Sequence, residues 1–214
     1  MKKSYAVFGM GRYGRAVARE LVDHGADVIV VDSDERIVNA AADEFPICKC
    51  ADITDPDVLK QLGIASVDVV VIAMANELES SVMAVTLCKE IGVPHVIAKC
   101  ANEVHQKILK RVGADQVVFP EKESGIRLAK NLLSSGFIDI VSLAKDVSMV
   151  ELEIKPEWIG KNLIELDLRR RYSVNVVALR KGDMVTVEID PSAGLSEGDK
   201  LIVIANTTKL AKLK

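Results

Sequence analysis

The feature that most constrains the fold of this chain is a glycine-rich motif near its N-terminus, GMGRYG at residues 9–14. An apolar run at residues 5–8 precedes the motif, and an amphipathic segment follows it. A second apolar run at residues 28–31 then ends at Asp32. The order strand, glycine turn, helix, strand and acidic residue is typical of a dinucleotide-binding βαβ unit. The motif therefore predicts a nucleotide site, and the alternative is a tight turn that holds no ligand.

Each glycine of the motif has a distinct predicted role. Gly9 permits the tight turn, Gly11 lets the backbone approach a phosphate, and Gly14 lets the helix lie close to the strand. The free N–H groups and the positive dipole end at the helix start then favour an anion. Asp32 is placed to accept hydrogen bonds from ribose hydroxyls.

Composition excludes several classes of function. The 214 residues suffice for one large domain or two small ones. A net charge of −3 and an aromatic content of 4% disfavour a nucleic-acid partner. Apolar runs such as residues 69–75 are far shorter than the roughly 20 residues of a membrane-spanning helix. The N-terminal residues lead directly into the first strand, so we expect no signal peptide and a cytoplasmic protein.

The four cysteines are expected to be reduced in a cytoplasmic protein. Cys48 and Cys50 could form a metal-binding pair, because alternation in a strand places both sulfur atoms on one face. The interpretation we favour is that they are buried strand cysteines. None of the three histidines has metal-ligand spacing with them.

Strand-like and helix-like segments alternate through residue 119, which predicts a Rossmann-like, doubly wound parallel sheet of the α/β class. Ser33 is a candidate cap for the second helix, and Thr54 or Asp55 for the third. The six predicted strands lie at residues 5–8, 27–31, 46–50, 68–73, 95–99 and 116–119.

The pattern changes after a predicted bridging helix at residues 121–135. Strict alternation at residues 150–154 and a hairpin joining residues 174–179 to 185–189 indicate a small α+β domain. We expect a boundary near residue 138, with domains at residues 1–138 and 139–214. Further elements of the second domain are a strand at residues 201–205 and helices at residues 162–171 and 207–214.

Several motifs, taken in order, resemble the cytosolic regulatory subunits of bacterial potassium uptake systems, the Ktr/Trk type built from RCK domains. They cover essentially the whole chain. The motifs are the glycine loop with Arg12, VDSD at residues 31–34, CADITD at 50–55, GAD at 113–115 followed by PEK at 120–122, and GDKL at 198–201.

The resemblance implies an adenine nucleotide at the glycine loop: ATP, ADP or NAD(H). It also implies homodimers that assemble into a ring, an octamer, which docks on the inner face of the membrane against a membrane-embedded potassium-conducting subunit. Some related C-terminal domains bind a cyclic dinucleotide. The implied function is a nucleotide-sensing gating subunit, not an enzyme.

The resemblance also assigns site residues. Arg12 occupies the phosphate-contacting position, Asp32 the ribose position, and Asp52 with Ile53 the region flanking adenine. Glu121 lies near the phosphates and a divalent cation, Mg²⁺ or Ca²⁺. The candidate nucleotide-binding set is Gly9, Gly11, Arg12, Tyr13, Gly14, Asp32, Ser33, Asp34, Asp52, Ile53, Ala73, Lys99 and Glu121.

Some Ktr-type members carry asparagine where this chain has Asp34. The additional carboxylate leaves the identity of the nucleotide open.

Other interpretations of these residues exist. Arg12 could be solvated, although a cation near the positive end of a helix favours an anionic partner. Glu121 could simply interact with the dipole of its helix, and the three arginines at residues 169–171 are typical of a solvated helix end. An NAD(P)-dependent oxidoreductase is the alternative function. It lacks support, because no tyrosine has a lysine four residues later and no histidine has an evident carboxylate partner.

Overall fold

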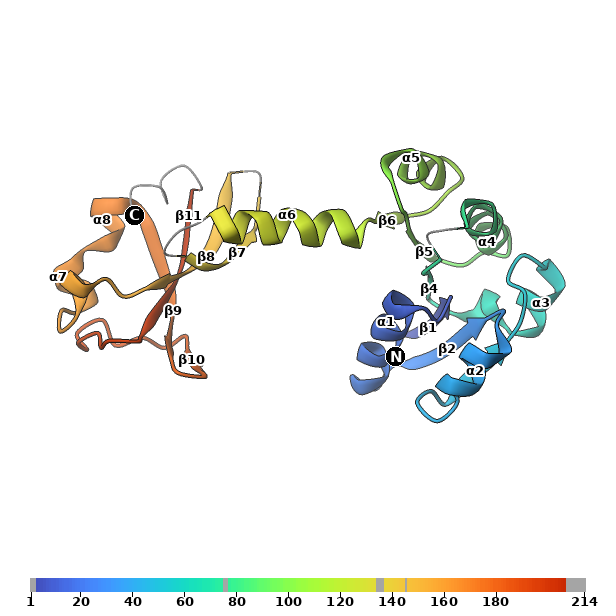
Figure 1. Ribbon diagram of the computed structural model, residues 1–214, viewed down its shortest axis with the longest axis horizontal. Coiled ribbons are helices and arrows are strands. Elements are labelled where there is room, and N and C mark those ends of the chain that lie inside the picture. Colours follow the sequence, from blue (N-terminus) through green and yellow to red (C-terminus); the bar gives the residue numbers. More distant parts are fainter. Residues whose placement is uncertain (1–2, 75–76, 134–136, 145, 207–214) are drawn as a thin grey trace. The chain divides into compact units, whose positions relative to one another are not determined.

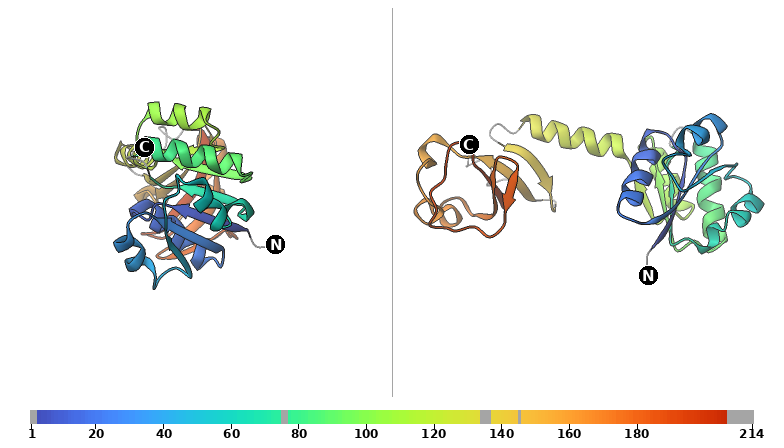
Figure 2. Two further views of the ribbon diagram at one scale, coloured as in Figure 1. Left: turned by 90° about the vertical axis from the view of Figure 1, so that its right-hand side faces the viewer. Right: turned by 90° about the horizontal axis from the view of Figure 1, so that it is seen from below.

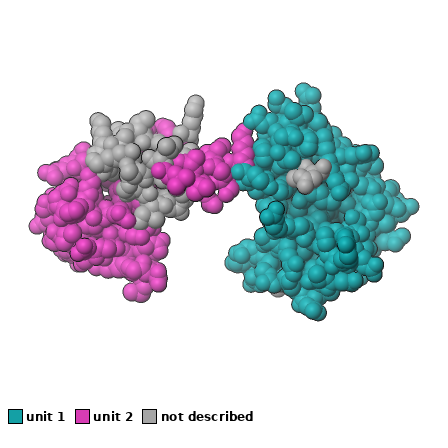
Figure 3. All heavy atoms as spheres, in the orientation of Figure 1, with its two compact units in different colours: residues 1–121 teal, residues 122–214 magenta. Residues whose placement is uncertain are grey.

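The computed structural model describes residues 3–74, 77–133, 137–144 and 146–206 (Figure 1). The chain divides into two compact units, residues 1–121 and 122–214 (Figure 3). The bridging helix starts in the first unit, and most of its residues are grouped with the second. The predicted domain boundary near residue 138 stays a prediction.

The first unit is built on a six-stranded parallel sheet with the order β3-β2-β1-β4-β5-β6. The strand order reverses between β1 and β4, which confirms the predicted doubly wound topology. The strands are β1 Ser4–Phe8, β2 Asp27–Asp32, β3 Ile47–Cys50, β4 Val69–Ile72, β5 His95–Lys99 and β6 Gln116–Val118.

Helices cover both faces of this sheet (Figures 1 and 2). Successive residues of a strand point to opposite faces, so Ala6 and Phe8 pack into one core cluster and Val7 into another. Apolar residues of α3, α4 and α5 join the first cluster, and those of α1 and α2 join the second. The helices are α1 Arg12–Asp23, α2 Glu35–Ala41, α3 Pro56–Gln61, α4 Leu78–Glu90 and α5 Glu103–Arg111, with a 3₁₀ turn at Ile64–Ser66.

Short polar side chains start three of these helices. Asp55 accepts a hydrogen bond from the Asp57 backbone N–H at the start of α3, as predicted. Asn102 caps α5 in the same way. The prediction for α2 was wrong by one residue, because Asp34 and not Ser33 is the cap.

The second unit contains a five-stranded antiparallel sheet with the order β10-β9-β11-β8-β7. Its core gathers apolar residues of β8, β9 and β11 with Trp158, Leu166 and Leu168. This arrangement confirms the predicted α+β class. The elements are α6 Pro120–Leu133, β7 Phe137–Ser142, β8 Val147–Glu153, a 3₁₀ turn at Pro156–Trp158, α7 Leu163–Leu166, α8 Leu168–Tyr172, β9 Val174–Lys181, β10 Met184–Thr186 and β11 Lys200–Asn206.

Three local predictions for the second unit were wrong. The single helix expected at residues 162–171 is divided into α7 and α8, because Asp167 adopts a left-handed conformation with φ of 42°. The strand expected to reach residue 189 ends at Thr186. Strand β7 was not anticipated. The helix expected at residues 207–214 lies outside the described residues.

Candidate nucleotide-binding site

The glycine motif forms a tight connection between β1 and α1. Gly9 has φ of +88°, a conformation that favours glycine. A Cβ atom on Gly14 would lie 1.9 Å from the Gly9 carbonyl oxygen, so this position requires glycine for packing. A Cβ atom on Gly11 would have no neighbour within 4 Å, so the backbone there borders open space. The geometry leaves room for a ligand at Gly11 and none at Gly14.

Asp32, the last residue of β2, fixes the glycine loop. One carboxylate oxygen accepts a hydrogen bond from the Met10 backbone N–H at 2.7 Å, and the other accepts one from the Asp34 N–H at 2.9 Å. Because a carboxylate offers about four lone-pair sites, Asp32 retains capacity for hydroxyl donors. The same side chain can therefore order the loop and accept hydrogen bonds from a ribose.

A groove lies at the carboxyl ends of the strands, where ligands bind in open α/β sheets. It brings together five of the candidate residues: Gly9, Asp32, Ser33, Asp52 and Ile53. Its other lining residues are Val31, Ala51, Thr54, Met74, Glu77 and Ser80. Glu77 and Ser80 were not among the residues predicted from the sequence. Their position could have indicated a role in the site, because both are polar residues that follow an apolar strand and lie at the start of the next helix.

Asp52 and Ile53 lie at one side of this groove and have local partners. Asp52 accepts hydrogen bonds from the Thr54 backbone N–H at 2.9 Å and from the Thr54 hydroxyl at 2.7 Å. These bonds lower the pKa of the Asp52 carboxyl below its ordinary value. Ile53 is 6% exposed and packs in the main core. An ionised acceptor therefore lies beside an apolar surface, a combination suited to the polar edge and the flat face of a base.

A second group of candidate residues surrounds an ion pair. The Lys99 ammonium, at the end of β5, donates a hydrogen bond to Glu121 in the first turn of α6 at 2.6 Å. The same ammonium lies 5.4 Å from the centre of the Tyr13 ring. Lys99 is the main cause, and Arg12 a smaller one, of a lowered pKa of the Glu121 carboxyl. The start of α1 and the start of α6 are thus linked through Lys99.

Two further candidates have structural partners. The Ala73 backbone N–H donates to the Phe8 carbonyl at 2.8 Å, which places Ala73 against the glycine turn. Asp34 caps α2 and forms an ion pair with Arg36 at 2.7 Å, and hydrogen bonds with Arg36 lower the pKa of Asp34 to about 2. The Asp34 charge is therefore offset by Arg36, and Asp34 does not line the groove.

Glu121 was also the predicted metal ligand. The described residues contain no group of three or more metal-ligating side chains. A site with one carboxylate still fits Mg²⁺, which keeps several waters and uses one or two carboxylates together with substrate phosphates. Glu121 is 62% exposed, so its free oxygen is accessible for this purpose.

The cysteine prediction was partly wrong. Cys88 and Cys100 are buried, and burial raises the pKa of Cys88 to about 12. Cys50, in contrast, is exposed, and Cys48 is half-buried. Strand β3 is at the edge of the sheet, so the face that carries both sulfur atoms is incompletely covered.

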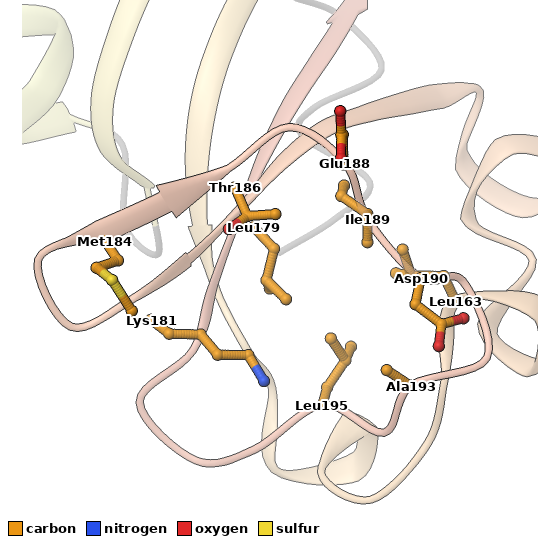
Figure 4. A pocket seen from close by; sticks show the side chains of 10 residues that line it. All are labelled: Leu163, Leu179, Lys181, Met184, Thr186, Glu188, Ile189, Asp190, Ala193 and Leu195. Carbon is orange, nitrogen blue, oxygen red and sulfur yellow. The ribbon is translucent and has the colours of Figure 1, made fainter.

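The described residues of the second unit line at least two pockets. One lies beneath the β9–β10 hairpin and the following loop and is largely apolar, with Lys181 and Asp190 at its border (Figure 4). The other lies between α7, α8 and β9. It is lined by Leu163, Asp167, Leu168, Arg169, Val174, Asn175 and Val176.

No helix among the described residues combines the length and apolar character needed to cross a membrane. The fold and the groove together define a class: a Rossmann-type nucleotide-binding unit followed by a small α+β unit.

Comparison with known proteins identifies the family. The TrkA-N domain matches residues 5–120, and the TrkA-C domain matches residues 147–214. The chain is 34% identical over 214 residues to Ktr system potassium uptake protein C of Bacillus subtilis, covering 100% of this chain and 97% of that protein. It is 33% identical to Ktr system potassium uptake protein A of Vibrio alginolyticus, covering 99% and 97%.

The chain belongs to this family, the RCK regulatory proteins of Ktr and Trk potassium uptake systems. A solved structure of the GsuK channel bound to NAD has the same fold, with a TM-score of 0.71 at 18% identity. That comparison covers 100% of this chain and 39% of the channel chain.

Proposed function

We propose that this chain is a nucleotide-sensing regulatory subunit that gates a membrane-embedded potassium-conducting subunit from the cytoplasmic face. The observation that carries the proposal is that the first unit holds both a groove bordered by the glycine turn and an ion pair between Lys99 and Glu121 at the start of α6. Asp32 and Asp52 line the groove, while Lys99 and Glu121 connect the carboxyl end of β5 to α6. A ligand that reached Lys99 could therefore act on α6.

The ligand we propose is an adenine nucleotide: ATP, ADP or NAD(H). Asp52 and Ile53 would hold the base, Asp32 the ribose, and the glycine loop the phosphates, because each offers the matching chemistry. The GsuK channel was solved bound to NAD, and GsuK was also solved bound to ADP, which makes both reasonable first ligands to test. The acidic lining by Asp32, Asp52 and Glu77 disfavours a nucleotide with a 2′-phosphate.

Arg12 is the proposed phosphate sensor. It is an exposed cation at the first position of α1, where only an anion makes a positive charge favourable. A guanidinium can bind two phosphate oxygens at once, so it can distinguish ATP from ADP. In vesicles that contain the membrane partner, Arg12→Ala should reduce the difference between ATP and ADP in potassium flux more than it weakens binding. A full ATP-versus-ADP difference in this variant would exclude Arg12 as the sensor.

Assembly into homodimers and then a ring, an octamer, is part of the proposal. All described side chains from Glu121 to Ala129 in α6 are exposed, as is Leu132. A helix of 14 residues gains little stability in isolation, so this helix needs a packing partner. A second copy of the chain supplies one.

The experiment that tests the ligand is calorimetry of purified protein with ATP, ADP, NAD⁺ and NADH, each with and without Mg²⁺. Binding that is lost in Asp32→Ala would support the site. Failure of all four nucleotides to bind would contradict the proposed function. The alternative, an NAD(P)-dependent oxidoreductase, requires turnover of a substrate coupled to cofactor absorbance, and no described feature supplies the acid–base group that it needs.

We also propose that the pocket between α7, α8 and β9 is the site of a second ligand, a cyclic dinucleotide. Arg169 and Asn175 offer phosphate and base partners, and Leu163 and Val176 offer apolar contacts. Cyclic di-AMP and cyclic di-GMP are the probes, and Arg169→Ala is the variant. Equal affinity of the wild type and Arg169→Ala for the bound probe would contradict this assignment.

A further inference from the structure

The groove at the carboxyl ends of the strands has a one-sided charge. Its lining includes the carboxylates of Asp32, Asp52 and Glu77, and the described lining residues include no lysine, arginine or histidine. The hydrogen bonds from Thr54 that lower the pKa of Asp52 keep that carboxylate ionised. Every nucleotide proposed for this groove is an anion, and repulsion between like charges grows with the charge of the ligand. A groove of this kind favours the nucleotide with the smallest net charge.

Glu77 differs from the two aspartates because the local fold does not depend on its carboxylate. Asp32 and Asp52 each accept hydrogen bonds from backbone N–H groups. Glu77 directly precedes α4, and its side chain makes no capping hydrogen bond. Among the described residues its partner is the Ser80 hydroxyl, which donates to one carboxylate oxygen at 3.3 Å. Glu77 is also exposed, so its charge can be removed with little effect on the fold.

The segment that follows β4 places Glu77 on the same groove as the glycine turn. A Cβ atom on Gly9 would lie 2.6 Å from the Met74 side chain and 3.5 Å from the Met74 backbone nitrogen, so the two segments are in contact. The Ser81 hydroxyl donates to the Met74 carbonyl oxygen at 2.6 Å, which attaches the start of α4 to this segment. Gly9 and Glu77 consequently border one groove, at the point between β1 and β4 where the strand order reverses. Phosphates at the glycine turn would bring their charge toward Glu77.

We propose that Glu77 sets the nucleotide preference of this groove by its charge. The positive end of α4 would otherwise favour a phosphate, and the Glu77 carboxylate places a negative charge there instead. Glu77 thereby disfavours ATP and ADP, with about four and about three negative charges, relative to NAD⁺, whose net charge is about minus one. This role rests on the proposed nucleotide site, where the charge of Glu77 favours NAD⁺ in the absence of divalent cations.

The decisive measurement is calorimetry of the full-length protein with NAD⁺, NADH, ADP and ATP, in EDTA and at low ionic strength. Glu77→Gln keeps the size of the side chain and removes its charge. This variant should bind ATP about three- to tenfold more tightly than the wild type and NAD⁺ within about twofold, with NADH and ADP between them. The gain should shrink as salt is raised toward about 1 M, where the Debye length falls to about 3 Å. A purely structural effect of the substitution would show neither this order nor this salt dependence.

Glu79→Gln is the matched control, because it removes an equal charge from the first turn of the same helix. Glu79 is exposed and is not among the residues that line the groove. This substitution should change the ratio of ATP affinity to NAD⁺ affinity by less than about 1.5-fold, since solvent and salt screen a charge outside the groove. Glu77→Asp retains the charge and should keep the wild-type ratio.

Two outcomes would overturn the role of Glu77 and leave the nucleotide site standing: an affinity ratio that is unchanged in Glu77→Gln, or an equal change in Glu79→Gln. If neither the wild type nor Glu77→Gln binds any of the four nucleotides, the proposed function and the role of Glu77 both fail. Glu77→Ser, with a residue favoured at the start of a helix, replaces Glu77→Gln if circular dichroism shows that the glutamine variant does not fold.

Discussion

At the scale of single residues, the glycine motif contains two positions with opposite requirements. Gly14 packs against the Gly9 carbonyl, and a methyl group there would lie 1.9 Å from that oxygen. We expect Gly14→Ala to destabilise the protein by about 1–3 kcal/mol or more, because the obstructing atom belongs to the backbone. Urea denaturation measures the effect. A loss below about 0.5 kcal/mol would mean that α1 can move away from β1 at little cost.

Gly11 provides the matched comparison. Its φ of −65° is accessible to alanine, and a Cβ atom would have no neighbour within 4 Å. Gly11→Ala should therefore leave the unfolding midpoint nearly unchanged while it weakens nucleotide binding by about tenfold, as the methyl group occupies space that a phosphate must approach. Calorimetry with the best-binding nucleotide measures the loss of affinity. Equal affinity of Gly11→Ala and the wild type would place the phosphates elsewhere.

Residues of the glycine turn could be predicted from the sequence because their roles depend on a short, continuous segment. Gly9, Gly14 and Asp32 have roles set by the strand–turn–helix–strand order alone. The pair of Lys99 and Glu121 could not be predicted, because 22 positions separate the two residues in the sequence. Only the parallel arrangement of β5 and β6 brings them together.

At the scale of elements, the start of α2 depends on an ionised Asp34. Its pKa is lowered to about 2 from an ordinary value of 3.8, mainly by its hydrogen bond to the Arg36 side chain. Because this pKa is lowered in the folded protein, the stabilisation that ionised Asp34 gives to the folded state is fully present above pH 3.8. It is lost as the pH falls through about 2. Carbon-detected magnetic resonance of the Asp34 carboxyl should show a midpoint near 2. Arg36→Gln should raise that midpoint toward 3.8, and a wild-type midpoint already near 3.8 would contradict the assigned ion pair.

Elements of the two units differed in how well the sequence predicted them. The central strands β1, β2 and β4 of the first unit are largely buried on both faces and have continuous apolar runs, so their positions were predicted to within one residue. In the second unit, the turn at Asp167 interrupts a helical pattern that appears continuous in sequence. The reason is tertiary: Leu166 and Leu168 both pack into the core, which a straight helix would not allow for residues two apart.

At the scale of the whole molecule, the two units have separate cores. Leu59 is fully buried in the core of the first unit, and Leu201 in that of the second. Either leucine-to-alanine change should destabilise its own unit by about 2–5 kcal/mol. Hydrogen exchange followed by mass spectrometry should show lost protection in residues 1–121 for Leu59→Ala and in residues 122–214 for Leu201→Ala. Equal loss in both units from either variant would indicate a single cooperative unit.

The last prediction concerns assembly through α6. Ile126, Leu128 and Leu132 are 48%, 59% and 77% exposed, although each is a large apolar residue. Exposed apolar residues on one helix mark a surface that another protein covers, and a second copy of the same helix is the simplest partner. Replacing Leu128 and Leu132 together with glutamate should shift the protein from oligomer toward monomer in light scattering at micromolar concentration. Met184→Glu, at an exposed apolar position on β10, is the control and should leave the mass unchanged. An oligomer that survives the double substitution would place the subunit interface away from α6, and the path from Glu121 through α6 to a neighbouring subunit would then have no structural basis.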